Sequence, residues 1–502
     1  MLIADLVARC RAQPDAVAVI QDRHETTFGQ LLQVACGWGG QWRSLPGFGP
    51  GGIVAIQLPN SADYAAAVMA CHWLGAAVLP VNTQWRPEEF SRNLDGLPVS
   101  GLIGNRQTLA PWHDSRVWGK VPLLAVEDRP SAPTVAEQDR LEALLQRDLA
   151  DTSALVLMTS GSSGPAKIVI RSHAQLLANA RQVGAELQWP AGCRILPVTP
   201  FFHANGFSNG LLLPLWSGGR IVLLRQFFPA TFVDLIEREA VQVVIGSPVV
   251  YESLLRHEVR PGTCRSLEYA ISSGAALPTG VAGQFRQRFG IPVRELFGTS
   301  ETGTIAIGPR HGGPFGDGTV EPAPGDSIAG RPLPGVKVSI LSDDGRPLPR
   351  GEVGAIGVHS PAVMKGYWSP GGLHEGRLPG GPYLTGDRGW LDDEGQLWLR
   401  GRSPRFLNIS GNKVSAGEVE QVLSGLSGVT RARVEVEGTP SQLVATLWLS
   451  AGAALKQSEV LAHCRGQLAE YKIPRRFVLE TVTAADLPDK HSVVMERPTD
   501  VS

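Results

Sequence analysis

Short apolar runs alternate with longer amphipathic stretches along the first hundred residues of the chain. Runs rich in valine, isoleucine and alanine at 17–20, 53–58 and 77–81 predict strands, and the stretches at 27–42 and 61–74 predict helices. Strands that are separated by helices favour a mostly parallel sheet with both faces covered. This part of the chain therefore predicts an α/β unit.

The same alternation returns after an apolar run at 154–158. A second α/β unit is predicted from helices at 174–187, 205–215 and 230–239 and strands at 194–198, 220–224, 243–245 and 270–273. Between 310 and 382 the chain is rich in glycine and proline with short strand patterns, which predicts a small β-rich subdomain.

Helix and strand patterns restart after residue 400. They lie at 416–426, 432–436, 443–449, 456–468 and 476–479. A compact α+β unit of this size suits a mobile second domain. The predicted fold class is therefore α/β: residues 1–400 hold two α/β units plus the β-rich subdomain, and residues 401–502 form a small mobile α+β domain.

Composition narrows the range of partners. The 502 residues include 46 basic and 47 acidic side chains and no polybasic run, so neither nucleic acid nor an anionic membrane is an expected partner. The six cysteines are scattered without a CxxC pair, which favours buried free thiols in a reducing compartment. The apolar stretch 64–81 suits a buried helix and strand, and the first residues lack a signal peptide pattern. We expect no membrane span and a cytoplasmic location.

One loop carries the clearest chemistry. It combines hydroxyls, glycines and a lysine directly after a buried strand: Thr159, Ser160, Gly161, Ser162, Ser163, Gly164 and Lys167. Backbone N–H groups, hydroxyls and one positive charge are suited to a phosphate. The spacing differs from a Walker loop, because Lys167 follows Pro165-Ala166 and precedes Ile168. An ordinary Gly/Ser surface turn is the alternative at this stage.

Further motifs follow in order along the chain. They are Phe297-Gly298-Thr299-Ser300-Glu301, Tyr383-Leu384-Thr385-Gly386-Asp387, Gly401-Arg402 and Ile409-Ser410-Gly411-Asn412-Lys413. Together with the loop at 159–167 they resemble the ordered signatures of the adenylate-forming superfamily, which contains acyl-CoA synthetases, adenylation domains and luciferases. The resemblance covers nearly the whole chain.

The resemblance implies a role for each motif. The loop would hold the phosphates of ATP or AMP, with Ser300 bonding a phosphate oxygen and Glu301 holding Mg²⁺. Asp387 would take the ribose hydroxyls, and the remaining nucleotide contacts would come from Gly274, Ala275, Ala276, Phe297, Gly298, Thr299 and Arg402. Simpler alternatives are a helix N-terminal charge at Glu301, a turn aspartate at Asp387 and close packing at 274–276.

The branch of the family is indicated by Phe201-Phe202-His203-Ala204-Asn205-Gly206. An aromatic-His pair resembles acyl- and aryl-CoA ligases, whereas amino-acid-activating members carry an aspartate in this region. The implied reaction joins a carboxylic acid to AMP and then passes the acyl group to coenzyme A. The implied catalytic set is His203, Glu301, Gly411 and Lys413, with the loop at 409–413 meeting pantetheine. His203 as a core residue is the alternative.

We also expect Trp216 and Ser247-Pro248 to shape the acyl pocket.

Four positions depart from the family pattern, two of them with a clear consequence for the chemistry. The signature lysine near the C-terminus, which reaches the α-phosphate during adenylation, is replaced by Val494 within Leu487 to Arg497. Loss of one such charge contact typically costs about 10² to 10³ in rate. The hinge residue after Gly401-Arg402 is Pro404, whose fixed φ restricts the swing of the small domain. Ala166 and Ile168 are smaller departures.

Three hypotheses follow. The first is an acyl-CoA synthetase specialised for the thioester half-reaction, which accepts a preformed acyl-adenylate from a separate adenylating enzyme. The second is a complete ATP-dependent ligase in which Lys490 replaces the missing lysine. The third is a catalytically silent protein that binds nucleotide or acyl ligand. Retention of Glu301, Asp387, Arg402 and the phosphate loop argues against the third.

Overall fold

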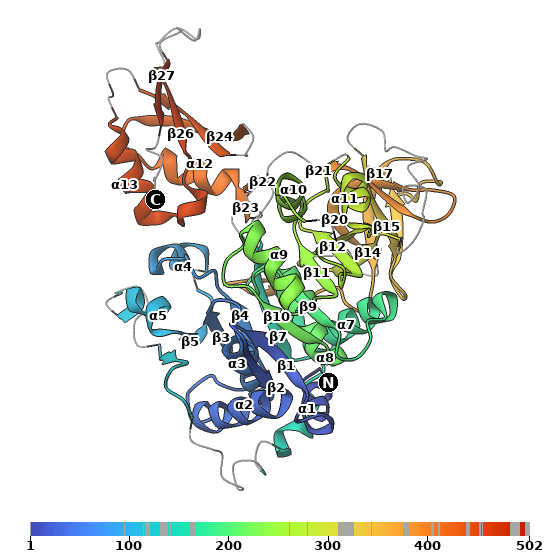
Figure 1. Ribbon diagram of the computed structural model, residues 1–502. Coiled ribbons are helices and arrows are strands. Elements are labelled where there is room, and N and C mark those ends of the chain that lie inside the picture. The colour runs from blue at the N-terminus through green and yellow to red at the C-terminus, as the bar shows by residue number, and fades with distance from the viewer. Residues whose placement is uncertain are drawn as a thin grey trace.

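The structure is a computed structural model that describes most of residues 2–496 (Figure 1). The positions not described within that range are 95, 114, 116–120, 131–138, 140–141, 160–166, 261, 279, 310–325, 343, 375–380, 403–405, 410–411, 438–441, 451–452, 454 and 482–491.

An eight-stranded sheet takes up much of the first α/β unit. In spatial order its strands are β19 (Gly372–His374), β18 (Gly366–Ser369), β8 (Lys167–Ser172), β7 (Ser153–Thr159), β4 (Ala77–Pro80), β3 (Ile53–Gln57), β5 (Val99–Gly104) and β6 (Leu123–Ala125). The strands from β7 to β6 run parallel, whereas β8, β18 and β19 add an antiparallel edge.

A thirteen-stranded sheet holds the second unit and part of the β-rich segment, whose strands β18 and β19 belong to the smaller sheet. Its order is β16 (Lys337–Leu341), β17 (Gly354–His359), β20 (Tyr383–Leu391), β21 (Leu397–Arg402), β15 (Asp326–Pro332), β14 (Gly303–Ile307), β13 (Val293–Thr299), β12 (Tyr269–Ser273), β11 (Val243–Gly246), β9 (Arg194–Pro197), β10 (Arg220–Leu223), β1 (Val17–Gln21) and β2 (His24–Thr27). The strands from β13 to β1 are parallel, whereas those from β14 to β16 at one end and β2 at the other pair in antiparallel fashion.

The helices of these two units are α1 (Leu2–Ala12), α2 (Phe28–Trp42), α3 (Ala62–Leu74), α4 (Pro87–Asn93), α5 (Arg106–His113), α7 (His173–Leu187), the π-helix η1 (Gly206–Leu212), α8 (Leu213–Ser217), α9 (Pro229–Arg238), α10 (Pro248–Arg256) and α11 (Val281–Phe289). Helices α2, α3, α7 and α9 begin and end within one residue of the predicted stretches. The helix predicted at 205–215 is divided between η1 and α8, and the other helices were not predicted. Thr27 and Ser172 each accept a hydrogen bond from the third residue of the helix that follows, which explains where α2 and α7 begin.

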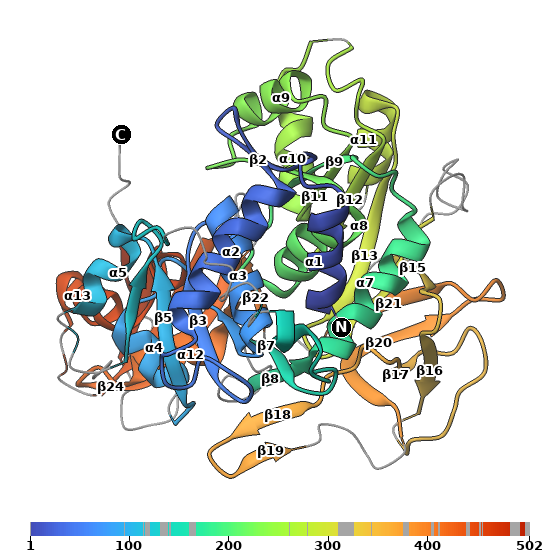
Figure 2. The same ribbon diagram turned by 90° about the horizontal axis from the view of Figure 1, so that it is seen from below.

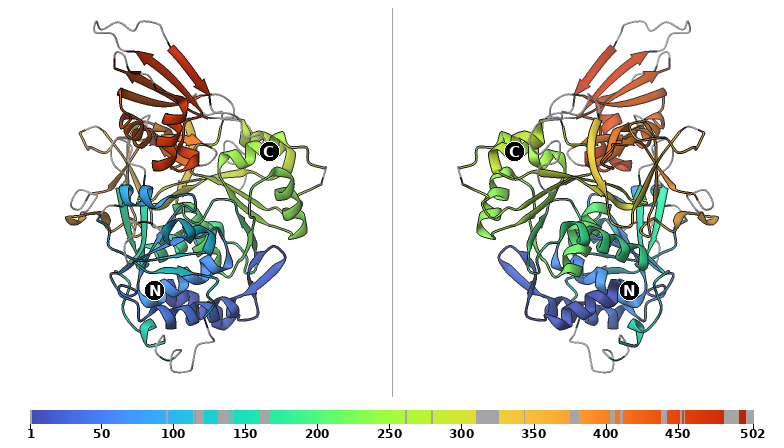
Figure 3. Two further views of the ribbon diagram at one scale, coloured as in Figure 1. Left: turned by 90° about the vertical axis from the view of Figure 1, so that its left-hand side faces the viewer. Right: turned by 90° about the vertical axis from the view of Figure 1, so that its right-hand side faces the viewer.

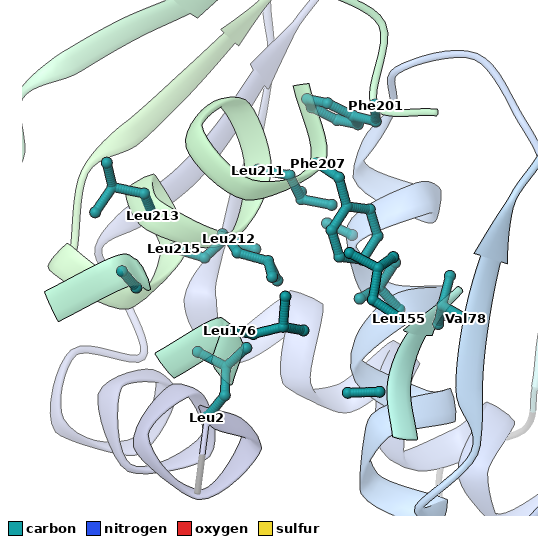
Figure 4. Packing of buried hydrophobic residues seen from close by; sticks show 14 of the residues in the cluster. Leu2, Val78, Leu155, Leu176, Phe201, Phe207, Leu211, Leu212, Leu213 and Leu215 are labelled. Carbon is teal, nitrogen blue, oxygen red and sulfur yellow. The ribbon is translucent and has the colours of Figure 1, made fainter. Parts of the chain in front are cut away.

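A helical layer lies between the two sheets. Helix α3 is buried all round, from Tyr64 to Leu74, as expected for a helix covered on every side. Its cluster joins residues of both sheets, such as Leu155 of β7 and Ile195 of β9. Figure 4 shows Phe207 of η1 beside Leu155 and Val78. This packing confirms the prediction that 64–81 is a buried helix followed by a core strand.

The C-terminal unit, defined here as residues 406–496, has a sheet and core of its own. It contains β22 (Phe406–Ile409), β23 (Asn412–Ser415), α12 (Ala416–Ser424), β24 (Val429–Glu437), β25 (Gln442–Leu449), α13 (Gln457–Gln467), the 3-10 helix η2 (Glu470–Lys472), β26 (Arg476–Thr481) and β27 (Ser492–Glu496). Strands β24 to β27 form a four-stranded sheet, and β22 pairs with β23. Figures 1 and 3 show this unit at the opposite end of the molecule from α1 and α2.

The mixed α/β fold class is confirmed, with one refinement to the arrangement. Strand β1 pairs with β10 in the larger sheet, so the first unit is not a self-contained sheet. The domain boundary at 400/401 stays a prediction, because β21 runs on to Arg402 opposite Asp387. All six cysteines are free and buried, as predicted. Among the described residues, no helix has the length and apolar character needed to span a membrane.

Candidate functional site

The β7–β8 hairpin presents the predicted phosphate loop. Thr159 ends β7 opposite Lys167, which begins β8, and the Thr159 hydroxyl donates to the Lys167 carbonyl at 3.4 Å. The tip itself, residues 160–166, lies outside the described residues. Strand β18 pairs with β8, and the ammonium of Lys167 lies 5.0 Å from the ring centroid of Tyr367. The base of the hairpin is therefore flanked by an aromatic side chain of β18, the strand that lies beside β8 in Figure 2.

Glu301 lies at the tip of the β13–β14 hairpin. Thr299 and Thr302 hold this turn by reciprocal bonds, each hydroxyl accepting from the other's backbone N–H at 3.2 Å. Gly303 has φ +69°, and a Cβ there would lie 1.9 Å from Oδ1 of Asn179. The turn therefore requires glycine at 303, and Glu301 belongs to a hairpin instead of a helix N-terminus.

Two tyrosines connect Glu301 to the other predicted motifs. The Tyr367 hydroxyl donates to Oε1 of Glu301 at 2.9 Å and lies 2.8 Å from the hydroxyl of Tyr383, the first residue of the 383–387 motif. Burial, followed by the negative charge of Glu301, raises the pKa of both tyrosines. Both hydroxyls are therefore protonated at neutral pH. The structure brings the phosphate hairpin, the Glu301 turn and strand β20 together at this point.

Arg171 is a charged residue that sequence reasoning missed. It lies on β8, is 1% exposed, and donates from Nη2 to the carbonyl of Ala362 at 3.1 Å. Burial lowers the pKa of Arg171 to about 10, with the charge of Glu301 acting in the opposite direction. Arg171 therefore stays charged at neutral pH and supplies fixed positive potential behind Glu301. The available signal in the sequence was an arginine directly after the apolar run 168–170, where a buried charge needs a partner.

Asp387 lies within β20 and is 8% exposed. It stands opposite Arg402 of β21, and its N–H donates to the hydroxyl of Thr385 at 3.1 Å. Gly386 between them has φ +78°, a conformation that favours glycine. The structure thus places Asp387 in a locally distorted strand and brings the backbone of Arg402 beside it.

The small-residue segment Gly274-Ala275-Ala276 follows β12, next to β13. Gly274 has φ +90°, and a Cβ there would meet nothing within 4 Å, so the segment is open on that side. Leu277, directly after it, donates its N–H to Glu295 Oε2 at 3.1 Å. Burial raises the pKa of Glu295 to about 7, against the effect of the Leu277 N–H. This bond ties the residue after the segment to β13, two positions before Phe297.

His203 precedes a helix that differs from the prediction. The expected α-helix at 205–215 is a π-helix over 206–212, whose start packs closely: a Cβ on Gly206 would lie 2.0 Å from the carbonyl oxygen of Pro200. His203 is half-buried with its ring 4.5 Å from that of Phe202. Widened helices of this kind occur often at functional sites. An apolar pattern alone does not distinguish a π-helix from an α-helix.

Buried amides connect this helix to the Glu301 turn. Asn209 donates to Oδ1 of Asn205 at 2.9 Å and to the hydroxyl of Thr304 at 3.2 Å. The N–H of Thr304 donates to Asn179 at 2.8 Å. Trp216 was expected to shape the acyl pocket. Its indole N–H instead donates to Asp5 of α1 at 3.3 Å, a contact that does not support this expectation.

Two histidines are buried beneath the β7–β8 hairpin. His72 of α3 donates its Nε2–H to the carbonyl of Ala154 at 2.9 Å, and its ring lies 4.9 Å from that of His173. Both side chains are 0% exposed. Burial lowers the pKa of His72 to about 4 and that of His173 to about 2. Both imidazoles are therefore neutral in the folded protein.

Several predicted residues are placed in part or not at all. Lys413 stands opposite Asn408 in the β22–β23 hairpin, and Val494 stands opposite Val478 in the β26–β27 pair. Gly411, Pro404 and Lys490 lie outside the described residues.

The described residues contain no cluster of three His, Cys, Asp or Glu side chains that could hold a metal. A single carboxylate such as Glu301 fits Mg²⁺, which is commonly held by one or two carboxylates together with substrate phosphates and water.

Known proteins are similar to this chain over most of its length. Residues 6–368 match the family model described as AMP-binding enzyme. Sulfoacetate–CoA ligase of Cupriavidus necator is 27% identical over 495 residues, which cover 95% of this chain and 93% of that protein. An amide bond synthetase of Marinactinospora thermotolerans is 25% identical with a TM-score of 0.81, covering 97% of this chain and 98% of that chain.

Two complexes of one solved relative differ in how similar they are to this chain. The o-succinylbenzoate CoA synthetase of Bacillus subtilis, as a double mutant bound to a product analogue, has a TM-score of 0.78 at 24% identity, covering 95% of this chain and 94% of that one. With its acyl-adenylate intermediate, the same enzyme has a TM-score of 0.66 at the same identity and coverage. The arrangement of elements here is nearer to that of the product-analogue complex.

Proposed function

The chain belongs to the AMP-binding enzyme family and is an acyl-CoA synthetase, and we propose that it is specialised for the second half of that reaction. In this half-reaction the sulfur of CoA attacks the carbonyl carbon of an acyl-adenylate. The bond from that carbon to the phosphate oxygen breaks, AMP leaves with the electron pair, and the thiol proton passes to solvent. The acyl-adenylate comes from a separate adenylating enzyme.

The valine at position 494 carries this proposal. In the pattern that the chain resembles, a lysine at this point neutralises charge on the α-phosphate during adenylation. Valine has neither charge nor hydrogen-bonding group, and residue 494 lies in a regular strand opposite Val478. We infer that adenylation is slower by about 10² to 10³ than in a lysine-bearing enzyme.

The residues proposed to bind an acyl-adenylate match the family motifs. Arg171 and Lys167 supply positive charge on β8, and the Tyr367 hydroxyl orients Glu301. Asp387 and the segment 274–276 are the proposed contacts to ribose and adenine. Mg²⁺, when held by Glu301 and the phosphates, would offset negative charge on the nucleotide. His203, Gly411 and Lys413 are the proposed residues on the acyl and pantetheine side.

The arrangement of the chain agrees with this proposal. Its similarity to the product-analogue complex of the Bacillus subtilis enzyme exceeds its similarity to the acyl-adenylate complex of the same enzyme. Pro404 at the hinge position would favour a single arrangement, since its φ is fixed near about −65°.

The proposal is tested with two assays on the full chain. Synthetic acyl-adenylates of aliphatic and aryl acids are mixed with CoA, and thioester is measured by chromatography. The same acids are tested for ATP–pyrophosphate exchange. We expect thioester formation with at least one adenylate and little exchange with any acid. Gly411→Ala should block the thioester assay by narrowing the pantetheine path.

A complete ligase that uses Lys490 would show exchange that Lys490→Ala abolishes. A silent binding protein would show neither activity.

A further inference from the structure

A group of charged residues is buried where the C-terminal unit meets α4. The ammonium of Lys472 lies 2.5 Å from Oε1 of Glu89 and 3.0 Å from Oε1 of Glu418. Lys472 is 3% exposed and Glu89 is 0% exposed. Glu89 is 383 residues from Lys472 in sequence, so the pair joins two distant parts of the chain. We call Glu89, Glu418, Lys472 and Arg92 the docking network.

The network contains two acidic and two basic residues. Arg92 of α4 donates to the carbonyl of Gln467, and its guanidinium lies 4.0 Å from Glu418. Asn93 donates to Glu418 at 3.4 Å. Burial raises the pKa of Glu89, with Lys472 acting against that rise. Burial would lower the pKa of Lys472, but Tyr471, Glu418 and Glu89 together raise it above its usual value. The charges therefore depend on one another.

The network lies at the base of the predicted pantetheine hairpin. Strand β23, which carries Lys413, runs directly into α12, and Glu418 is in the first turn of that helix. Glu418 lies only five positions after Lys413 in the sequence. A shift of α12 relative to α4 would therefore move the hairpin as well.

Burial makes this contact sensitive to the loss of one partner. A buried ion whose partner is removed is strongly destabilised, whereas an exposed ion is rehydrated at little cost. If Glu89 is neutralised, Lys472 gains hydration when the C-terminal unit separates from α4. Loss of one partner therefore favours separation of the C-terminal unit from α4. This effect is distinct from any change in the stability of either part.

We propose that Lys472 and Glu89 are positioning residues for CoA transfer, because their buried pair holds the C-terminal unit docked on α4 and so fixes the β22–β23 hairpin. This inference rests on the proposed function for its catalytic consequence. The docking itself is a separate physical claim and is tested separately.

Docking is measured by single-molecule energy transfer between labels at Glu25→Cys and Ser458→Cys. Both positions are exposed, and all six native cysteines are buried. The variants are Glu89→Gln and Lys472→Met. The control is Glu252→Gln, which removes the partly exposed Arg256 pair at 3.5 Å on α10.

We expect one docked population in the unaltered protein and in the control. In each variant the ratio of docked to separated molecules should fall by about tenfold or more, as for a two-state equilibrium that loses a buried ion pair. The rate of thioester formation from saturating benzoyl-AMP, or from whichever adenylate the unaltered protein uses, should fall with it. The Kd for the adenylate should stay unchanged, and Lys472→Arg should restore part of both losses.

An unchanged distance distribution in Glu89→Gln and Lys472→Met would overturn the proposal, even if Tm falls, because the pair would then be structural. A lost docked state with an unchanged transfer rate would overturn the positioning role. If the unaltered protein makes no thioester from any adenylate, the proposed function fails, while the distance measurement still decides the docking claim.

Discussion

Tyr367 of β18 donates its hydroxyl hydrogen to Oε1 of Glu301 at 2.9 Å, across 66 positions of sequence. The two residues belong to different sheets: β18 is the second strand of the eight-stranded sheet, and Glu301 is at the tip of the β13–β14 hairpin in the larger one. The backbone N–H of Met364 also donates to the Glu301 carbonyl at 2.6 Å. The site therefore forms where the two sheets are joined at Glu301.

Tyr367→Phe should weaken Mg²⁺-dependent ATP binding by about 10-fold to 100-fold, because a hydrogen bond to a charged group contributes about 1.5–3 kcal/mol. Titration calorimetry with and without Mg²⁺ measures the effect. Tyr269→Phe, outside this chain of hydroxyls, is the control. Equal affinities of Tyr367→Phe and the unaltered protein would show that the bond does not orient Glu301.

Gly303→Ala should destabilise the folded protein by about 3 kcal/mol, since a Cβ in the left-handed region costs about 1–2 kcal/mol before any clash. The added carbon would lie 1.9 Å from Asn179 Oδ1. Gly283→Ala in α11 is the matched control, because its Cβ would meet nothing within 4 Å. The control should raise Tm slightly through helix propensity. A higher Tm in both Gly303→Ala and Gly283→Ala would show that the turn does not require glycine at 303.

The two buried histidines predict a loss of stability in acid. Their pKa values of about 4 for His72 and about 2 for His173 lie below the usual 6.5, so the unfolded chain binds more protons below pH 6.5. Their contribution is complete above that pH and falls as pH drops toward 4, by about 1.4 kcal/mol per unit for each histidine.

Denaturation at pH 7.5 and 5.5 measures this loss. His72→Gln should reduce the difference between the two pH values by roughly half of the histidine contribution, because one of two titrating groups is removed. An unchanged difference in the variant would mean that folding does not lower the pKa of His72.

The elements were predictable because each has a local signal. The strand at 154–158 and the helix at 174–187 agree with β7 and α7 to within a residue or two, since apolar period and N-cap residues are read locally. The pairing of β1 with β10 had no local signal, because both runs are equally apolar and about 200 residues apart. Strand membership of a sheet is a non-local property.

The sequence predicted the motifs of the site but not the residues that contact them. Glu301 and the 383–387 motif could be named from sequence, whereas Tyr367 lies in a segment with no recognised motif and meets Glu301 only after folding. Arg171 was readable in principle as a charge in an apolar strand. The π-helix at 206–212 needed coordinates, since its close contact with Pro200 is what requires Gly206.

Restoring adenylation should require two changes. Val494→Lys returns a charge worth roughly 3–4 kcal/mol at the transition state if it reaches the α-phosphate. We expect the fixed φ of a proline at the hinge to keep residue 494 away from the α-phosphate, so the single change should recover little exchange. Adding Pro404→Asp should recover more than the sum of the single effects. Strictly additive recoveries would show that the hinge and residue 494 act independently.

The central claim is that this chain transfers an acyl group from adenylate to CoA and forms the adenylate poorly. The most direct measurement compares, on one preparation and one acid, the rate of thioester formation from synthetic acyl-AMP with the rate from the free acid and Mg-ATP. We predict a ratio of about 10² or more in favour of acyl-AMP, set by the missing lysine contact. Equal rates, with pyrophosphate exchange that Lys490→Ala abolishes, would contradict the claim and establish a complete ligase.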